Sequence, residues 1–190
     1  MAQGDLFVVT GVMASGKTSV AEALARRFDR SAHVRGDVFR RFIVSGRDPM
    51  GSPLSEEAER QLALRRTLGA DAALAYRAAG FTAVLQDLYL GRHLVEVVER
   101  LMGASPHVVV LCPSVEAVAE REARREKRGY RHWDVEGLWR TFMEETPRLG
   151  LWIDTTTLDV DETVTAILDD PEASRVDASD LERVRRPTHG

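Results

Sequence analysis

Short apolar runs alternate along the chain with longer segments in which apolar residues recur at helical spacing. A continuous apolar run between turn residues is typical of a buried strand in a parallel sheet, and helical spacing is typical of a helix with one buried face. The apolar runs predict strands at 6–10, 32–35, 82–86, 107–112 and 151–154. Because helices separate them, we predict an α/β fold in which five parallel strands form a doubly wound sheet flanked by helices.

The helical spacing predicts helices between and after these strands. They are expected at 17–28, 38–43, 56–79, 93–102, 114–128, 135–145 and 162–168. The segment 45–55 is rich in glycine, proline and polar residues, which predicts a loop. The last residues, 171–190, are charged and lack regular apolar spacing, which predicts a flexible C-terminal tail. One domain is therefore expected over residues 1–170.

Composition and charge disfavour several classes of protein. The chain has 190 residues and a net charge of −4, so a general affinity for nucleic acid or for an anionic membrane is not indicated. No apolar run is long enough to span a bilayer, and residues 1–6 lack the features of a secretory signal. The single cysteine, Cys112, cannot form an internal disulfide. These observations predict a cytoplasmic protein.

A glycine-rich loop follows the first predicted strand and carries the most specific motif in the chain. The stretch GVMASGKT, residues 11–18, matches GxxxxGK[ST] between a predicted strand and a predicted helix. Backbone N–H groups in such a loop face a phosphate, the lysine adds a positive charge, and the Ser/Thr hydroxyl is placed to ligate Mg²⁺. We therefore predict that the chain binds ATP and Mg²⁺, with Lys17 also catalytic and Thr18 a metal ligand. The predicted nucleotide-binding residues of the loop are Gly11, Val12, Met13, Ala14, Ser15, Gly16, Lys17, Thr18 and Ser19.

Two carboxylates stand where predicted strands end. Asp37 follows the second strand and opens a helix, so it is a candidate base that accepts a proton from an acceptor hydroxyl, or alternatively a helix cap. Asp87 ends the run TAVLQ, a position from which it could hold Mg²⁺ or the acceptor, or simply form a turn. Asp37 as base and Asp87 at the metal or substrate is the preferred division, and swapped roles stay open.

An arginine-rich segment lies at about 120–134. Arg121, Arg125 and Arg128 are spaced so that one helical face could present all three guanidinium groups to a polyphosphate, as a lid does; a solvated helix with Glu–Arg pairs is the alternative. Tyr89 and Trp133 have polar neighbours and are candidates for an acceptor pocket. Arg40 is a further acceptor candidate. With Arg35, Arg41 and Arg47 it could form part of a basic track leading to Asp37.

These segments together resemble the small P-loop kinases of the shikimate and gluconate kinase type and, within that group, chloramphenicol phosphotransferase and related antibiotic or metabolite phosphotransferases. The resemblance spans most of residues 6–168 and rests on GVMASGKT, GDVFR, LQDLYLG, REARREKR and DTTTLDVDETV. It implies a P-loop NTPase-type fold with a helical lid, ATP and Mg²⁺, a hydroxyl acceptor and Asp37 as base. By the same likeness Arg121 would lie near the adenine, Arg125 and Arg128 near the phosphates, and the loop after Asp154, with Thr155, would help to hold the base. In the segment 44–54 nothing identifies the acceptor.

The expected function is transfer of the γ-phosphate of ATP to a hydroxyl of a small molecule, an antibiotic or a metabolite. A nucleoside, nucleotide or polynucleotide-end kinase is one alternative, and the basic track would favour its polynucleotide form. A non-catalytic ATP-binding regulator is the other. A guanine-specific switch is disfavoured because the chain has no NKxD-like element.

Overall fold

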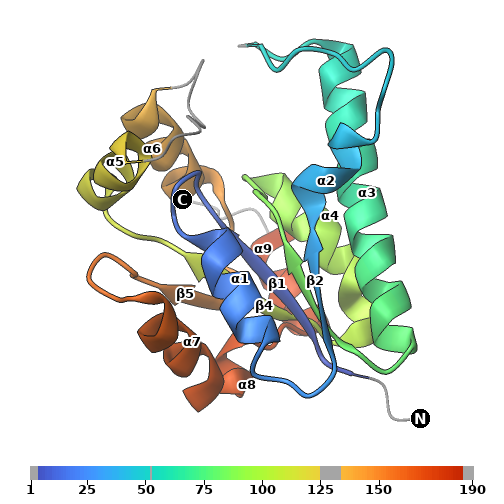
Figure 1. Ribbon diagram of the computed structural model, residues 1–190, viewed down its shortest axis with the longest axis vertical. Helices are drawn as coiled ribbons and strands as arrows, with labels where there is room; N and C mark the ends of the chain where they lie inside the picture. The colour runs from blue at the N-terminus through green and yellow to red at the C-terminus, as the bar shows by residue number, and fades with distance from the viewer. Residues whose placement is uncertain (1–3, 52, 125–133, 186–190) are drawn as a thin grey trace.

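A single parallel sheet organises the computed structural model, which describes residues 4–51, 53–124 and 134–185 (Figure 1). Within these residues the strand order is β2-β3-β1-β4-β5, and every neighbouring pair is parallel. The strands are β1 (Leu6–Gly11), β2 (Ser31–Arg35), β3 (Thr82–Gln86), β4 (His107–Leu111) and β5 (Leu151–Ile153). The predicted five-stranded, doubly wound parallel sheet is therefore confirmed.

The central strands are covered on both faces. All residues of β1, β3 and β4 are buried, which explains why they are continuous apolar runs rather than alternating ones. Alternate residues of β1 enter different cores: Leu6 and Val8 join one cluster, and Phe7 and Val9 join the other. The strand pleat thus divides the apolar side chains between two layers of helices.

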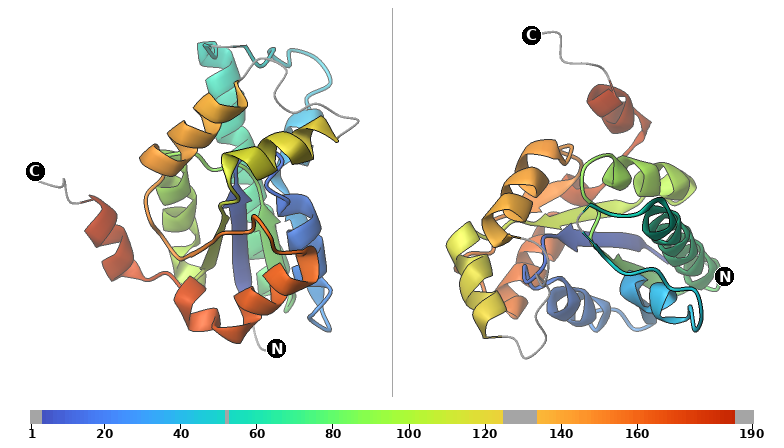
Figure 2. Two further views of the ribbon diagram at one scale, coloured as in Figure 1. Left: turned by 90° about the vertical axis from the view of Figure 1, so that its left-hand side faces the viewer. Right: turned by 90° about the horizontal axis from the view of Figure 1, so that it is seen from above.

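Helices form a layer on each face of the sheet. Helices α1 (Lys17–Ala25) and α7 (Val160–Asp169) pack on the Phe7 face, whereas α3 (Glu56–Ala78), α4 (Arg92–Leu101) and α6 (Val135–Glu145) pack on the Leu6 face. Figure 2 shows α1 and α4 on opposite sides of the sheet. The remaining helical elements are α2 (Gly36–Arg41), η1 (Met102–Ala104), α5 (Val115–Ala123), α8 (Pro171–Ser174) and α9 (Ala178–Arg185). The predicted helices are confirmed apart from shifts at their ends and the part of 114–128 that lies beyond the described residues.

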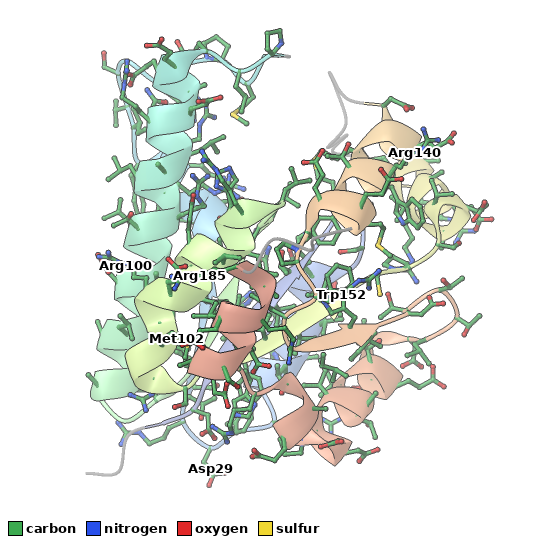
Figure 3. All side chains as sticks on the ribbon, turned by 180° about the vertical axis from the view of Figure 1, so that it is seen from behind. Asp29, Arg100, Met102, Arg140, Trp152 and Arg185 are labelled. Atoms are coloured by element: carbon green, nitrogen blue, oxygen red, sulfur yellow. The ribbon has the colours of Figure 1, made fainter. Side chains whose placement is uncertain are left out.

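The prediction of a flexible tail at 171–190 is wrong for residues 171–185. They form α8 and α9, and Val176 and Leu181 are buried in the core. The backbone N–H of Val176 donates to the Pro106 carbonyl, and Arg185 of α9 pairs with Glu99 of α4 (Figure 3). Together with partly buried Val184, Val176 and Leu181 are too few apolar anchors to produce a regular pattern over the segment, so the spacing rule did not detect the helices. Residues 186–190 lie outside the described residues.

No helix in the described ranges is both long and apolar enough to cross a membrane.

Candidate active site

The loop between β1 and α1 has the backbone shape of a phosphate cradle. Gly11 and Gly16 have φ values of +150° and +95°, a region that favours glycine. A Cβ on Gly11 would also lie 2.5 Å from the Leu111 carbonyl oxygen, whereas a Cβ on Gly16 would meet nothing within 4 Å. Gly11 is therefore required by close packing and backbone conformation, and Gly16 by backbone conformation alone.

Side chains of the loop are placed for a polyphosphate. The Lys17 ammonium donates to the Val12 carbonyl oxygen at 2.5 Å, so its charge lies across the loop. The buried Ser15 hydroxyl has no hydrogen-bond partner among the described residues. Helix α1 begins at Lys17, so its N-terminal dipole adds to the attraction for an anion. The open cradle, the lysine and the unpartnered hydroxyl fit the phosphates of a nucleotide.

Thr18 connects this loop to the neighbouring strand. Its hydroxyl lies 3.4 Å from the Gln86 carboxamide oxygen at the end of β3. The described residues contain no group of three or more His, Cys, Asp or Glu side chains that could hold a metal ion by themselves. A nucleotide-bound Mg²⁺ does not require one, since it keeps several waters and takes phosphate oxygens together with one or two protein oxygens. Thr18 suits that role, with Gln86 beside it.

Asp37 lies in the first turn of α2, not at its cap. The cap residue is Arg35, and no side chain caps the helix. The Asp37 carboxylate is hydrogen-bonded by Arg41 and lies 3.6 Å from Arg35 Nε, and about a third of the side chain is exposed. The helix-cap alternative therefore has no hydrogen bond to support it, and a partly exposed carboxylate is left just beyond the end of β2.

Asp87 is buried and held by an arginine that the sequence analysis did not single out. Arg65 of α3 donates from Nε to one Asp87 oxygen at 2.7 Å and from Nη2 to the other, and the Leu88 N–H donates to the carboxylate at 2.7 Å. Burial by itself would lower the pKa of Arg65, but the attraction of Asp87 outweighs it and the pKa is raised. Both Asp87 oxygens are thus engaged by protein, and a role as Mg²⁺ ligand stays a prediction.

Asp37 and Asp87 are brought together by the pairing of β2 with β3. Arg35 and Gln86 are register partners, so the two aspartates follow neighbouring strand ends. A Cβ on Gly36 would lie only 2.2 Å from Asp87 Oδ2, which shows how closely α2 begins against the Asp87 carboxylate. Arg65 also interacts electrostatically with Asp37. The two aspartates and Arg65 therefore form one cluster.

Tyr89 requires a correction to its predicted surroundings. Its side chain is fully buried in the core that α3 and α4 cover, rather than on the wall of an open pocket. Burial, followed by the charge of Asp87, raises the pKa of Tyr89 well above its ordinary value. Its hydroxyl has no hydrogen-bond partner among the described residues. The polar neighbours seen in the sequence did not indicate exposure, because Tyr89 turns inward after the strand.

Arg121 and Thr155, both predicted to bind the nucleotide, lie together. Arg121 Nη2 donates to the Thr155 carbonyl oxygen at 2.7 Å and approaches that of Thr156 at 3.4 Å. The Thr155 hydroxyl is buried without a partner among the described residues. Arg121 thus anchors the segment after β5, and its approach to adenine stays a prediction. The predicted site residues Arg125, Arg128 and Trp133, and the middle of the predicted lid, lie outside the described residues.

Arg40 lies one turn beyond Asp37 on α2. Its Nη2 donates to the Asp48 carbonyl oxygen, and Gln61 of α3 binds the same segment by accepting from the Asp48 N–H at 3.0 Å and donating to the Gly46 carbonyl at 2.8 Å. The expected loop at 45–55 is thus tied to α2 and α3 by side chains. Burial, then repulsion from Arg47 and Arg65, lowers the pKa of Arg40.

Sequence reasoning missed Arg65, Gln61 and Gln86. Gln86 had a weak signal, because it is a polar residue at the end of an apolar run. Arg65 and Gln61 had none, because charged and amide side chains are ordinary on a long helix. A separate hollow of about 450 Å³ lies between α3 and the start of α4, lined by residues including Arg66, Arg92 and His93. None of the predicted site residues lines it.

Solved structures share this architecture. A gluconokinase from Sinorhizobium meliloti superposes with a TM-score of 0.59 at 22% identity, covering 96% of this chain and 94% of that one. The tunicamycin resistance protein of Deinococcus radiodurans gives 0.64 at 18% identity, covering 92% and 98%. The APS kinase of Mycobacterium tuberculosis, solved with AMPPNP and APS, gives 0.61 at 19% identity, covering 90% and 99%. At these identities the likeness concerns the fold.

A comparison with curated proteins finds no match. A family model described as an AAA domain, AAA_33, matches residues 6–143, which include the phosphate loop, both aspartates and Arg121. The chain therefore belongs to the AAA_33 family, and its fold is that of the P-loop kinases.

Proposed function

We propose that this protein transfers the γ-phosphoryl group of ATP to a hydroxyl of a small molecule. The observation that carries the proposal is the connection between the phosphate loop and Asp37. Thr18 of the loop contacts Gln86, Gln86 is the register partner of Arg35, and Asp37 follows two residues later. A phosphate-binding loop and a partly exposed carboxylate thus occupy the same end of the sheet, where ligands of open α/β folds bind.

Each residue has a role in the transfer. Loop N–H groups and Lys17 bind the β- and γ-phosphates, and Thr18 would hold Mg²⁺, which supplies positive charge to the phosphates. Asp37 orients the acceptor hydroxyl and takes its proton while the acceptor oxygen bonds to the γ-phosphorus and the bond to the ADP oxygen breaks. Asp87 and Arg65 position α2. Arg125 and Arg128, in the predicted lid, would stabilise charge on the transferred group.

The rival functions differ in what stimulates ATP turnover. The structural neighbours are named as a gluconokinase, an APS kinase and a resistance protein, so this fold occurs in proteins with different named activities. The fold alone therefore does not identify the acceptor of this protein. A polynucleotide-end kinase would be stimulated by oligonucleotide ends, and a regulator by no acceptor. We favour a small acceptor because the chain is acidic overall.

The test is ATP consumption with Mg²⁺ across hydroxylated antibiotics, sugars, nucleosides and oligonucleotide ends. One acceptor class should stimulate turnover, and Asp37→Asn should lower that turnover by about 10²–10⁴-fold while ATP affinity, measured by calorimetry, is retained. Asp71→Asn is the matched control, because Asp71 forms an exposed pair with Arg100 on the outer helices. Full turnover in Asp37→Asn would exclude Asp37 as the base. Tight ATP binding without stimulation by any compound would favour the regulator.

A further inference from the structure

Five arginines surround the Asp37–Asp87 cluster, and they differ in how their charges are balanced. Arg35 and Arg41 pair with Asp37, and Arg65 pairs with Asp87. Arg40 and Arg47 make no ion pair with a carboxylate of the described residues, although Arg40 lies close enough to Arg47 and Arg65 to be repelled by both. The Asp48 carboxylate also attracts Arg40, so five arginines stand against three carboxylates, and the cluster has two positive charges in excess.

Arg40 is the more informative of the two. Its Nε is buried and has no hydrogen-bond partner among the described residues, while its Nη2 donates to the Asp48 carbonyl oxygen. A buried donor of a charged group is costly to leave unpaired, and the nearby positive charges add to that cost. An anion that accepts hydrogen bonds from the other N–H groups of this guanidinium would balance its charge.

The position of Arg40 indicates which ligand that anion belongs to. Asp37 and Arg40 are three residues apart on α2, so their side chains leave the same face of the helix. Arg47 lies on the segment that Arg40 and Gln61 hold against α2 and α3. A molecule whose hydroxyl reaches Asp37 would place a neighbouring substituent beside these two arginines.

We propose that the acceptor carries an anionic group, a carboxylate or a phosphate, and that Arg40 and Arg47 bind this group one helical turn from Asp37. The inference rests on the proposed function and narrows it to negatively charged hydroxylated compounds. Guanidinium groups suit both anions because their planar N–H donors match two oxygens at once.

Binding is tested first, without any transfer. Protein loaded with AMPPNP and Mg²⁺, so that the phosphate loop is occupied, is titrated with inorganic phosphate while the melting temperature is followed. Phosphate should raise the melting temperature in the parent protein and in Arg183→Gln, a control at an exposed arginine of α9. Arg47→Gln should reduce this rise, and Arg40→Gln should abolish it. An equal rise in all four proteins would overturn the proposal.

Arg47→Gln also serves as a control for misfolding of the Arg40→Gln variant. Arg40 donates to the Asp48 carbonyl, so Arg40→Gln could disturb the 45–55 segment, whereas no hydrogen bond of Arg47 to the described residues is lost in its variant. A reduced phosphate effect in Arg47→Gln, with an unchanged melting temperature before titration, assigns the effect to the lost guanidinium. Arg40→Lys keeps the charge without the planar donors, and should retain part of the effect.

Transfer is then compared between matched acceptors. Glycerate and glycerol 3-phosphate are each set against glycerol, and gluconate against sorbitol. The anionic member should have the higher kcat/KM, and Arg40→Gln should raise its KM by about 10- to 100-fold while KM for ATP stays unchanged. Comparison of the carboxylate-bearing acceptors with the phosphate-bearing acceptor shows which of the two anionic groups the site prefers. Equal use of charged and neutral members would overturn the inference, as would transfer that requires an oligonucleotide.

The two proposals fail in different ways. If no compound is phosphorylated but phosphate still stabilises the AMPPNP-loaded protein through Arg40, the anion site stands and the transferase is wrong. If a neutral compound is phosphorylated through Asp37, the transferase stands and the anion site is wrong.

Discussion

The phosphate loop and the arginine–aspartate cluster lie at the same end of the sheet but are built differently. The proposed nucleotide half consists of residues 11–19 with Arg121 and Thr155, and most of it is one continuous loop whose backbone N–H groups would bind the phosphates. The acceptor half consists of Asp37, Arg40, Arg47, Arg65 and Asp87, which come from α2, α3 and two connecting segments. Binding by backbone N–H groups tolerates changes of side chain at most positions of the loop. A site built from side chains is lost more easily, because each substitution removes one of the interacting groups.

The difference also concerns electrostatics. The proposed nucleotide half needs few charges, because helix N-terminal amides and Lys17 would supply most of the attraction for a phosphate. The acceptor half contains a buried pair, Arg65–Asp87, in which desolvation of both ions must be offset by their attraction and by the Leu88 N–H. Loss of the Arg65–Asp87 pair should therefore reduce stability, whereas loss of Lys17 in the nucleotide half should reduce activity alone.

The largest expected effect comes from breaking the Arg65–Asp87 pair. Arg65→Met leaves the Asp87 carboxylate buried without its partner, and should lower the free energy of unfolding by about 3–5 kcal/mol in urea titration. Arg100→Met is the matched control: it breaks an exposed Arg–Asp pair between α4 and α3 and should cost about 1 kcal/mol or less. Equal losses in the two variants would show that the buried pair has no special structural role.

Replacement of Lys17 tests the nucleotide half of the site. Lys17→Ala should lower kcat/KM for ATP by about 10²–10³-fold, because the charge facing the phosphates is lost, while the urea midpoint stays the same. Arg26→Ala, at the exposed end of the same helix, should change neither quantity. A Lys17→Ala protein with parental activity would remove the basis for calling this loop the nucleotide half.

A smaller loss is expected from Arg121. Arg121→Ala removes the hydrogen bond that holds the segment after β5, and should raise KM for ATP by about tenfold with little change in kcat. Arg124→Ala, three residues later, only gives up an exposed contact with Glu120 and serves as the control. If KM for ATP responds equally to both variants, Arg121 does not belong to the nucleotide half.

The smallest effect lies in a region outside both halves. His107 Nδ1 is 2.9 Å from the Pro171 carbonyl oxygen of α8, and burial, followed by the charge of Arg175, lowers the pKa of His107. Because the unfolded chain takes up a proton first, His107 should reduce stability as the pH falls below about 6.5 towards its folded-state pKa.

Urea titrations at about pH 7.5 and pH 5.5 measure this contribution. The loss of stability on acidification should be smaller in His107→Gln than in the parent. An unchanged loss in His107→Gln would show that His107 does not contribute. Nucleotide and acceptor kinetics should be the same in both proteins.

Local patterns were enough to predict much of the fold. The strand at 82–86 and the helix at 135–145 have the bounds that the apolar spacing predicts, because each is consistent along its whole length. The C-terminal helices were missed because the apolar anchors of this segment, buried Val176 and Leu181 and partly buried Val184, are too few for a regular pattern. Tyr89 was misplaced because the polarity of sequence neighbours does not report the direction of a side chain after a strand.

The sequence alone determined the alternating α/β architecture, the phosphate loop and the candidacy of Asp37 and Asp87, since each depends on residues that are adjacent or evenly spaced in the chain. Only the tertiary structure decided that Arg65 neutralises Asp87, that Gln86 faces Thr18, and that the buried Arg40 Nε has no hydrogen-bond partner among the described residues. These contacts join positions up to 68 residues apart. They arise when the pairing of β2 and β3 and the packing of α2 on α3 bring strand ends together, and no local pattern encodes that approach.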